Sequence, residues 1–448
     1  MDIDYLLTIF QEHHDKTMLS LNSKVYSYRW LEESVATWLV ELKKHGVLHG
    51  AVVGLQSDYS PNSIALLLAL IANKNIIVPM APTKNETIDE KIKIAMVEIL
   101  ATIDEEDRIH WLRVESSATH IYYEQLRQID SPGLVLFSSG TSGKPKGAVH
   151  DFARLLEKFK RRRTTMRTVN FLMFDHWGGL NTLFHTLSNG GLVLVVRERN
   201  PDHICAIIER FKVELLPASP TFLNLLIVSE AYKRYDLSSI KLITYGTEPM
   251  PESTLRKLTQ IFPDVRFQQT YGLIELGVLQ SKSRANDSLW VKIGGEGYQT
   301  RIVDGILQIK SYSSMLGYLN APSPFTEDGW FITGDQVEVD GEYIKILGRK
   351  SELINVGGEK VYPTEIENII LEIEDVAEVL VYGEKNPLMG NIVCARVRPR
   401  FENVHQSDLT KRIKLHCSKK LERYKVPIRI EFVFEAQFSD RFKKKRII

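Results

Sequence analysis

The sequence predicts an α/β fold class, with a large N-terminal domain of parallel sheets covered by helices, a β-rich subdomain and a small α+β C-terminal domain. Helical patterns alternate with short apolar runs over residues 31–261, which is typical of parallel sheets covered by helices. Over residues 294–347, short strands with Gly and Asp turns replace this alternation. The 448 residues, 44% of them hydrophobic, can bury at least two cores, because a single core stops growing at roughly 250–300 residues.

The elements follow from the spacing of apolar residues. Residues 31–44 and 62–73 predict helices, and the runs at 51–57 and 75–82 predict buried strands. Further strands are expected at 170–174, 192–196, 215–217 and 242–245, with helices at 201–211 and 251–261 between them. In the C-terminal region, 363–372 predicts a helix, and 378–382 and 394–397 predict strands. We expect domains at 1–347 and 348–448, with a hinge near 349–351.

Composition and charge exclude several classes of function. The formal net charge of +1 gives no overall field for nucleic acid or an acidic membrane. Three widely spaced cysteines make neither a disulfide framework nor a metal site. The first residues are acidic where a secretory signal would be basic, and the apolar stretch 64–79 is interrupted by polar residues. We therefore expect a cytoplasmic protein without a nucleic-acid or membrane partner.

The segment FSSGTSGKPKG at 137–147 follows an apolar run and carries the strongest functional signal. Glycines let bare N–H groups approach an anion, hydroxyl groups add donors, and lysines supply positive charge. The candidate phosphate-binding residues are Ser138, Ser139, Gly140, Thr141, Ser142, Gly143, Lys144, Lys146 and Gly147. The spacing does not fit a P-loop, since only two residues separate Gly140 from Gly143 and Pro145 follows Lys144. A flexible surface loop is the alternative explanation.

Four segments in order resemble the motifs of one family. They are the loop at 137–147, QTYGLIE at 269–275, WFITGD at 330–335, and GRKSELINVGGEKVYPTEIE at 348–367. Together they are similar to the adenylate-forming superfamily, which includes acyl-CoA and aryl-CoA ligases, peptide-synthetase adenylation domains and luciferases. The resemblance covers the chain from about residue 20 to the end. It implies a small C-terminal domain that acts as a mobile lid.

The resemblance implies a two-step reaction. A small carboxylic acid and Mg·ATP give acyl-AMP and pyrophosphate, and the acyl group then passes to a phosphopantetheine thiol. The acceptor is either CoA or a separate acyl carrier protein acting in trans. The alternative is a catalytically weak protein of the same fold that binds a nucleotide or acyl-adenylate as a sensor. Binding of nucleic acid through basic runs such as 158–163 ranks last, given the near-zero net charge.

The resemblance also implies roles for individual residues. Glu275 is expected to ligate Mg²⁺, Tyr271 to lie against adenine, Asp335 to accept the ribose hydroxyls, and Arg349 to contact ribose or phosphate. Thr141 is assigned to catalysis within the phosphate loop. Nucleotide-binding roles are also assigned to Gly246, Thr247 and Glu248.

The C-terminal region departs from the family pattern at two places. Ser351 occupies the hinge position, where Asp or Lys is usual. Gly357, Gly358 and Lys360 are expected to face the site in the thiol-transfer state, although a plain turn before a helix capped at Thr364 explains them equally well. Near the end of the chain, Phe442 stands where the family has glycine. Lys443 then aligns with the catalytic lysine of the family. If the alignment is shifted by one or two residues, Lys444 or Lys445 takes this position instead.

The substrate pocket is the least determined part. LMFDHWGGL at 172–180 resembles the family's L-F-H-x-x-G-L segment and places His176 on its histidine. Asp175 gives a rival alignment with amino-acid-activating domains, which the spacing to the following glycines disfavours. The expected pocket residues are His176, Trp177, Ser219, Tyr245 and Gly272, a set compatible with an aromatic acid or a medium acyl chain. The identity of the acid and the oligomeric state stay open.

Overall fold

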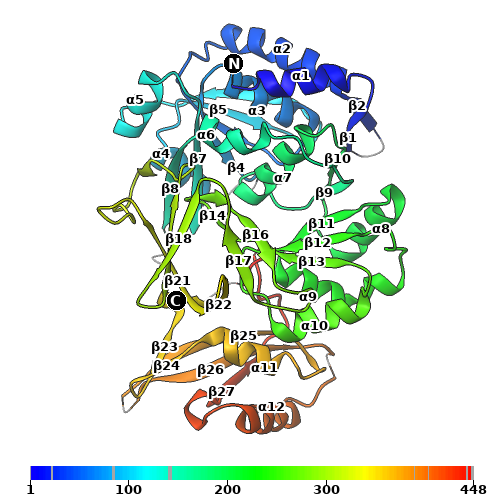
Figure 1. The fold of residues 1–448 in the computed structure, drawn as a ribbon, viewed down its shortest axis with the longest axis vertical. Coiled ribbons are helices and arrows are strands. Elements are labelled where there is room, and N and C mark those ends of the chain that lie inside the picture. The colour runs from blue at the N-terminus through cyan, green and yellow to red at the C-terminus, as the bar shows by residue number, and fades with distance from the viewer. Residues whose placement is uncertain are drawn as a thin grey trace. The chain divides into compact units, whose positions relative to one another are not determined.

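The computed structural model describes residues 2–21, 24–82, 86–139, 144–387, 389–401, 403–439 and 442–444. The chain divides into two compact units (Figure 1). The first comprises Met1–Pro217, Gly272–Val278 and Ser311–Pro324; the second comprises Ala218–Tyr271, Leu279–Lys310 and Phe325–Ile448. The expected boundary between residues 347 and 348 stays a prediction. Among the described residues, no helix combines the length and apolar character needed to cross a membrane.

A seven-stranded sheet in the first unit carries the flanks of the phosphate loop. Its order is β20-β8-β7-β4-β3-β5-β6, with bounds β3 (Val52–Gln56), β4 (Ile76–Met80), β5 (Ile99–Ile103), β6 (Ile109–Arg113), β7 (Gly133–Ser139), β8 (Pro145–Asp151) and β20 (Gly317–Tyr318). Neighbours among β7, β4, β3 and β5 are parallel, as expected for fully buried apolar strands. The strands β6, β8 and β20 pair antiparallel, so the sheet is mixed rather than wholly parallel.

A second group of strands in this unit has the order β11-β9-β10-β1-β2. The bounds are β1 (Thr17–Leu21), β2 (Lys24–Ser27), β9 (Thr168–Asn170), β10 (Val193–Val195) and β11 (Leu215–Ala218). The strand expected at 170–174 is wrong, because β9 ends where that run begins. Phe171 and Phe174 are buried side chains of a connecting loop, so the apolar run reflects burial rather than strand pairing.

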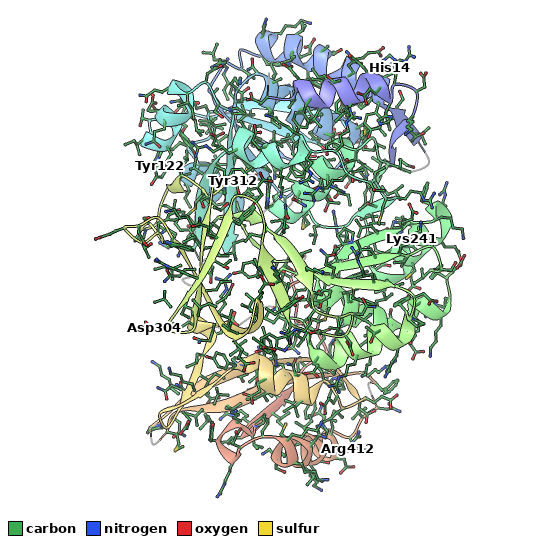
Figure 2. The ribbon with its side chains drawn as sticks, viewed as in Figure 1. His14, Tyr122, Lys241, Asp304, Tyr312 and Arg412 are labelled. Atoms are coloured by element: carbon green, nitrogen blue, oxygen red, sulfur yellow. The ribbon has the colours of Figure 1, made fainter. Side chains whose placement is uncertain are left out.

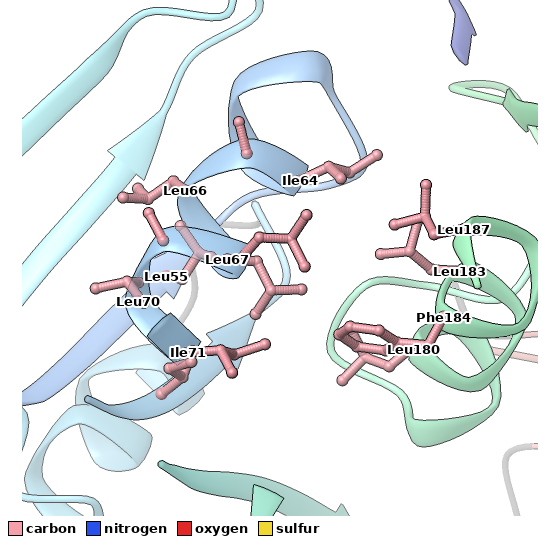
Figure 3. Packing of buried hydrophobic residues seen from close by; sticks show 14 of the residues in the cluster. Leu55, Ile64, Leu66, Leu67, Leu70, Ile71, Leu180, Leu183, Phe184 and Leu187 are labelled. Atoms are coloured by element: carbon pink, nitrogen blue, oxygen red, sulfur yellow. The ribbon is translucent and has the colours of Figure 1, made fainter. Parts of the chain in front are cut away.

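Helices cover these sheets in the first unit. They are α1 (Asp4–Glu12), α2 (Tyr28–Lys44), α3 (Pro61–Ala72), α4 (Glu86–Ile94), α5 (Ile121–Gln128), α6 (Phe152–Leu156), α7 (Trp177–Leu187) and α8 (Pro201–Phe211). Helix α3 begins with a capping box between Ser60 and Ser63 and has Pro61 in its first turn. From Ile64 to Ala72 its side chains are all apolar, and they belong to the same buried cluster as Leu180, Leu183, Phe184 and Leu187 of α7 (Figure 3). This packing fixes the helix that carries the predicted pocket residues.

The second unit begins with the parallel pair β12 (Leu242–Tyr245) and β13 (Arg266–Gln269), together with helices α9 (Pro220–Ser229) and α10 (Glu252–Ile261). It continues as a six-stranded sheet of order β16-β17-β22-β21-β19-β18. The bounds are β16 (Gln280–Ser283), β17 (Val291–Gly294), β18 (Tyr298–Val303), β19 (Ile306–Ser311), β21 (Phe331–Asp340) and β22 (Tyr343–Arg349). The β-rich subdomain predicted from the Gly and Asp turns is confirmed.

The C-terminal segment of the second unit is an α+β layer with its own core. It contains β23 (Ile354–Val356), β24 (Glu359–Val361), α11 (Pro363–Ile370), β25 (Val376–Asn386), β26 (Gly390–Pro399), α12 (Gln406–Lys420) and β27 (Arg429–Phe432). Apolar side chains from both helices and the sheet form one buried cluster that includes Ile366, Val379, Val397 and Leu409. Arg412, labelled in Figure 2, lies on α12. It pairs with Asp375. Strands β25 and β26 extend beyond the predicted runs at both ends. Several of the added residues, such as Glu384 and Lys385 of β25, are polar and at least partly exposed, so they fall outside the apolar pattern.

Candidate active site

The phosphate loop joins two antiparallel strands. The β7–β8 pairing sets Ser138 opposite Lys146, so both flanks of the loop are held by a ladder of main-chain hydrogen bonds. Gly140, Thr141, Ser142 and Gly143 lie outside the described residues, and so do their predicted roles. The backbone of Ser139 belongs to β7, and Lys144 is exposed.

Glu275 lies between two short strands, β14 (Gly272–Leu273) and β15 (Gly277–Val278). Its side chain is buried, and its Oε1 accepts a hydrogen bond of 2.6 Å from the Tyr318 hydroxyl. Lys146 Nζ lies 5.7 Å from the centroid of the Tyr318 ring. A lysine, a tyrosine and a buried carboxylate thus form one row beside the phosphate loop. Tyr318 was missed, since only the β20–β8 pairing brings it here.

The residues around Glu275 fit a magnesium ion that is also held by phosphate. Among the described residues, no group of three or more His, Cys, Asp or Glu side chains is arranged to hold a metal ion. Mg²⁺ is commonly bound by one or two carboxylates together with substrate phosphates and waters. The buried Glu275 carboxylate accepts a hydrogen bond from Tyr318, whose ring lies near Lys146, a residue predicted to bind phosphate; this arrangement matches that mode.

A second polar group lies in the other unit, around Asp335. The Tyr271 hydroxyl donates to its Oδ2 at 2.6 Å, and Arg349 Nε lies 2.8 Å from its Oδ1. Arg349 also donates to the Thr333 carbonyl at 2.8 Å, which holds the guanidinium in place. Burial raises the pKa of Asp335, although Arg349 and Tyr271 act in the opposite direction. Tyr271, expected against adenine, orients the Asp335 carboxylate through its hydroxyl here.

The predicted nucleotide loop at 246–248 is locally strained. Thr247 has a φ of +75°, which is an outlier for a β-branched residue. At Gly246, an added Cβ would lie 2.5 Å from Thr270 Oγ1, so a side chain does not fit there. Strained backbone of this kind concentrates at binding sites, and the nucleotide-binding role of this loop stays a prediction.

Glu248 connects the loop at 246–248 to Thr221 of helix α9 and to Lys444. Its Oε1 accepts hydrogen bonds from the main chain of Thr221, at 2.9 Å, and from the Thr221 hydroxyl. Its Oε2 accepts from the Lys444 main chain at 3.2 Å. The Lys444 side chain points elsewhere, with Nζ 2.6 Å from Oε2 of the buried Glu367. Lys443 is half-buried and precedes this contact, whereas Lys445 lies outside the described residues.

The predicted pocket residues of the first unit lie at the start of α7 and on the β14–β15 hairpin. His176 caps α7, with Nδ1 accepting from the Gly178 main chain at 3.0 Å. Trp177 is buried in the core. Gly272 approaches the facing strand so closely that a Cβ would lie 2.8 Å from the Gly277 carbonyl oxygen. Asp175, the rival anchor, is buried with Lys91 Nζ 3.9 Å from its Oδ2.

The two pocket residues predicted in the second unit are deeply buried. Ser219 is the N-cap of α9, and its Oγ accepts from the Phe222 main chain at 3.1 Å. The Tyr245 side chain is 1% exposed, and burial raises its pKa. Their assignment to the acid pocket stays a prediction.

The predicted hinge and thiol-transfer residues lie on exposed turns of the second unit. Ser351 is exposed in a single 3₁₀ turn, Lys350–Glu352. Gly357 and Gly358 have φ values of +60° and +95° in the turn between β23 and β24, and Lys360 is exposed on β24. Thr364 is not a helix cap: α11 begins after Tyr362, and the Thr364 hydroxyl donates to the Leu347 carbonyl at 2.6 Å.

Two family models match most of the chain. Residues 8–318 match the family described as AMP-binding enzyme, and residues 365–439 match the AMP-binding enzyme C-terminal domain. The chain belongs to the AMP-binding enzyme family. The superfamily resemblance seen in the four motifs is thereby confirmed.

Relatives of this AMP-binding enzyme include CoA ligases. It is 30% identical over 329 residues to an indoleacetate–CoA ligase from Aromatoleum aromaticum (strain DSM 19018 / LMG 30748 / EbN1), covering 68% of this chain and 64% of the relative. The alignment therefore spans a little under two thirds of that relative's length. It is 27% identical over 447 residues to a 2-succinylbenzoate–CoA ligase from Geobacillus sp. (strain WCH70), covering 90% of this chain and 88% of the relative.

The fold also agrees with solved structures. The anthranilate CoA ligase AuaEII, in complex with anthranoyl-AMP, superposes with a TM-score of 0.82 at 19% identity, covering 98% of this chain and 95% of that one. The predicted α/β fold, with a large N-terminal and a smaller C-terminal domain, is therefore confirmed.

Lys158, the first residue of the basic run 158–163, lies near the predicted pocket. Its Nζ donates to Asn181 Oδ1 of α7 at 2.5 Å and to the Val278 carbonyl of β15 at 3.1 Å. It also lies 5.5 Å from the Trp177 ring centroid. Lys158 therefore links the pocket helix to the hairpin of Glu275. Burial, and to a lesser degree the charge of Arg163, lowers the pKa of Lys158 to about 7.

This lowered pKa predicts a pH-dependent stability. In the unfolded chain a lysine has a pKa near 10.4, so between pH 7 and 10 the unfolded state binds more protons than the folded state. Stability therefore rises with pH in this window. Relative to Lys158→Met, the free energy of unfolding of the wild type is expected to increase by about 2 kcal/mol from pH 7 to pH 9.

Urea unfolding of both proteins at pH 7, 8 and 9 checks this expectation. Groups that titrate alike in both proteins cancel in the difference. Burial lowers the pKa of the neighbouring His185 from its ordinary value, which moves its titration away from this range. Parallel pH profiles for the wild type and Lys158→Met would contradict it.

Proposed function

We propose that this AMP-binding enzyme is an ATP-dependent acid–thiol ligase. It activates a carboxylic acid as acyl-AMP and then transfers the acyl group to a phosphopantetheine thiol, that of CoA or of a separate acyl carrier protein. The observation that carries the proposal is the row of Lys146, Tyr318 and Glu275 beside the phosphate loop. A cation and a buried carboxylate next to a Gly/Ser loop suit a magnesium-bound triphosphate.

The first step is attack of a carboxylate oxygen on the α-phosphorus of ATP. The bond from the α-phosphorus to the bridging oxygen breaks, and pyrophosphate leaves with the electron pair. No proton has to move, so the demands on the protein are orientation and charge neutralisation. Magnesium, when bound, would offset charge on the departing phosphates. Lys146 and the phosphate loop would hold these phosphates, Glu275 would hold the metal, and Lys443 would neutralise charge at the reacting centre.

The nucleoside would be recognised by the group around Asp335. Each of its carboxylate oxygens carries lone pairs beyond the one used by Tyr271 or Arg349. The ribose hydroxyls would donate to these remaining positions. The strained loop of Gly246, Thr247 and Glu248 would contact adenine, and Arg349 would reach ribose or phosphate.

The second step requires a thiol to attack the acyl carbon while AMP leaves. We propose the domain boundary at residue 348 and rotation of the C-terminal domain about Ser351 between the two steps. The exposed 3₁₀ turn at 350–352 supports this hinge, since few packed contacts oppose a change of backbone angles there. Gly357, Gly358 and Lys360 would face the site in the second state.

The acid is proposed to be aromatic or a medium acyl chain rather than an α-amino acid. Asp175, which would have to bind an amino group, is buried and already faces Lys91. The named relatives act on indoleacetate and 2-succinylbenzoate, which are aromatic acids. His176, Trp177, Ser219, Tyr245 and Gly272 stay the proposed pocket residues. We also propose a cytoplasmic location, which the three free cysteines support.

Pyrophosphate release tests this proposal. The purified chain is incubated with Mg·ATP and a panel of aryl, fatty and amino acids, each with and without CoA. Release with one acid class that CoA accelerates, with acyl-CoA as product, is the expected result. Release that CoA leaves unchanged would indicate a carrier protein as acceptor. No release with any acid, alongside measurable binding of ATP or AMP, would favour the sensor function.

A further inference from the structure

Phe442 adopts a backbone conformation that is unusual for a bulky residue. Its φ is +51°, in the left-handed region that glycine occupies without steric penalty. The family motif that this segment resembles has glycine at this position. Phe442 thus places an aromatic side chain on a backbone conformation that favours glycine, and left-handed outliers of this kind often mark function.

The Phe442 ring contacts two other aromatic rings. Its centroid lies 5.6 Å from that of Phe222 in an edge-to-face arrangement, and 5.3 Å from that of Phe438 in a stacked arrangement. Phe222 is fully buried on α9, so it offers a fixed surface. Aromatic pairs at these distances stabilise beyond the area that they bury. Phe442 thus attaches the end of the chain to α9.

The described residues 438–439 and 442–444 pair with one another as the two arms of a hairpin, and Lys443 lies on the second arm. The Ser439 main chain donates to the Lys443 carbonyl at 2.8 Å, and the Phe442 main chain donates to the Ser439 carbonyl at 2.8 Å. Phe438 and Lys444 form an antiparallel bridge. Lys443 therefore follows directly from a residue whose ring is fixed.

A second attachment lies on the far side of Lys443. The Lys444 main chain donates to Glu248, and its Nζ bonds the buried Glu367. Glu367 is itself oriented, because its Oε1 accepts from the Val381 main chain at 3.0 Å. The residue before Lys443 is held by rings and the residue after it by carboxylates.

We propose that Phe442 is a positioning residue that holds Lys443 in the docked hairpin during acid activation. This inference rests on the proposed function. A glycine at this position leaves the hairpin free to sample many conformations, whereas the ring restricts it to the conformation in contact with α9. The expected consequence is a higher kcat for the first step with little change in substrate affinity, because Phe442 acts through Lys443.

Three variants of Phe442 separate the effect of its ring from the effect of its backbone conformation. Phe442→Ala loses the ring and keeps a Cβ at positive φ, Phe442→Gly loses both, and Phe442→Leu keeps an apolar side chain. For pyrophosphate release, kcat is expected to fall about 10- to 100-fold in the Ala and Gly variants, because small misplacements of a catalytic group have effects of this size. The KM values for ATP and for the acid are expected to stay within about twofold of wild type. Phe442→Leu is expected to keep kcat within about threefold of wild type. The matched control is Phe434→Ala, whose side chain is exposed, and it should match wild type.

Trypsin digestion of the full-length variants gives a readout that does not need activity. Mass spectrometry follows cleavage after Lys443 and Lys444. Cleavage is expected to be about tenfold faster in Phe442→Ala and Phe442→Gly than in wild type and Phe434→Ala. The reason is that the cleavage rate follows the fraction of molecules in which the hairpin is undocked. Equal protection and equal kcat in wild type and Phe442→Gly would overturn the inference. A Phe442→Gly variant faster than wild type would also overturn it, since strain would then outweigh the ring.

The two readouts also separate the inference from the proposed function. If the wild type releases no pyrophosphate with any acid, the ligase proposal fails, and with it the role assigned to Lys443. The digestion then still decides whether Phe442 docks the hairpin. If the wild type is active and the variants keep both kcat and protection, only the positioning role fails.

Discussion

Lys443→Ala is expected to lower the rate of pyrophosphate release by about 100- to 1000-fold, because removing one preorganised charge-stabilising donor has effects of this size. The KM values for ATP and acid should change little. The neighbouring variant Lys444→Ala is expected to act mainly on stability, with a smaller loss of rate, because the main-chain contact of residue 444 with Glu248 still holds this side of Lys443. It would leave the buried Glu367 without its cation, which lowers the free energy of unfolding by up to about 3 kcal/mol.

Single-turnover pyrophosphate release and urea unfolding, measured on both variants, distinguish these roles. The pair is a matched comparison, since the two lysines are adjacent and lose the same atoms. If Lys444→Ala abolished release while Lys443→Ala retained it, the assignment of the catalytic lysine would move by one residue. Equal losses of stability in both variants would argue against the structural role given to Lys444.

Glu275→Gln is the second prediction with a large expected effect. The amide keeps the shape of the side chain and an oxygen for the Tyr318 hydroxyl, but removes the negative charge that a magnesium ion requires. Pyrophosphate release is expected to fall about 100-fold, with a higher magnesium concentration needed for half-maximal rate. Calorimetric titration of ATP at several magnesium concentrations gives a second readout, in which Glu275→Gln should weaken the dependence of ATP affinity on magnesium.

Tyr318→Phe is the control for this experiment. It removes the 2.6 Å hydrogen bond to Oε1 of Glu275 but leaves the charge and the ring beneath Lys146. We expect a loss of only a few-fold, typical of one neutral hydrogen bond that orients a ligand. A Glu275→Gln variant with wild-type magnesium dependence would contradict the metal-ligand role.

Sequence motifs indicated the candidate residues but not their partners. Glu275 and Asp335 were both found because they lie in short motifs, QTYGLIE and WFITGD, that resemble those of the adenylate-forming superfamily. Their partners come from remote positions: Tyr318 is 43 residues from Glu275, and Tyr271 is 64 residues from Asp335. Sequence patterns predicted a role for Tyr271 at the adenine face, but not the hydroxyl contact that orients Asp335.

The strand wrongly predicted at 170–174 and the position of Lys158 both depend on how distant segments pack. The run at 171–174 looks like a strand because it is apolar, but its burial comes from a loop packed inside the first unit. Hydrophobicity reports burial, and it does not tell whether the buried backbone pairs with a neighbouring strand. Similarly, Lys158 looks solvated within a basic run, while packing against α7 and β15 encloses its amine.

By itself, the sequence determined the alternation of helices and strands, the family, and the residues around which a nucleotide site is expected. These follow from the period of apolar residues and from short motifs, both of which act over a few residues along the chain. Only the tertiary structure showed that Lys444 pairs with Glu367 and that Tyr318 orients Glu275. It also showed that the rings of Phe222 and Phe438 contact Phe442. These contacts depend on where distant segments meet, and that is set by packing of the whole fold rather than by local sequence.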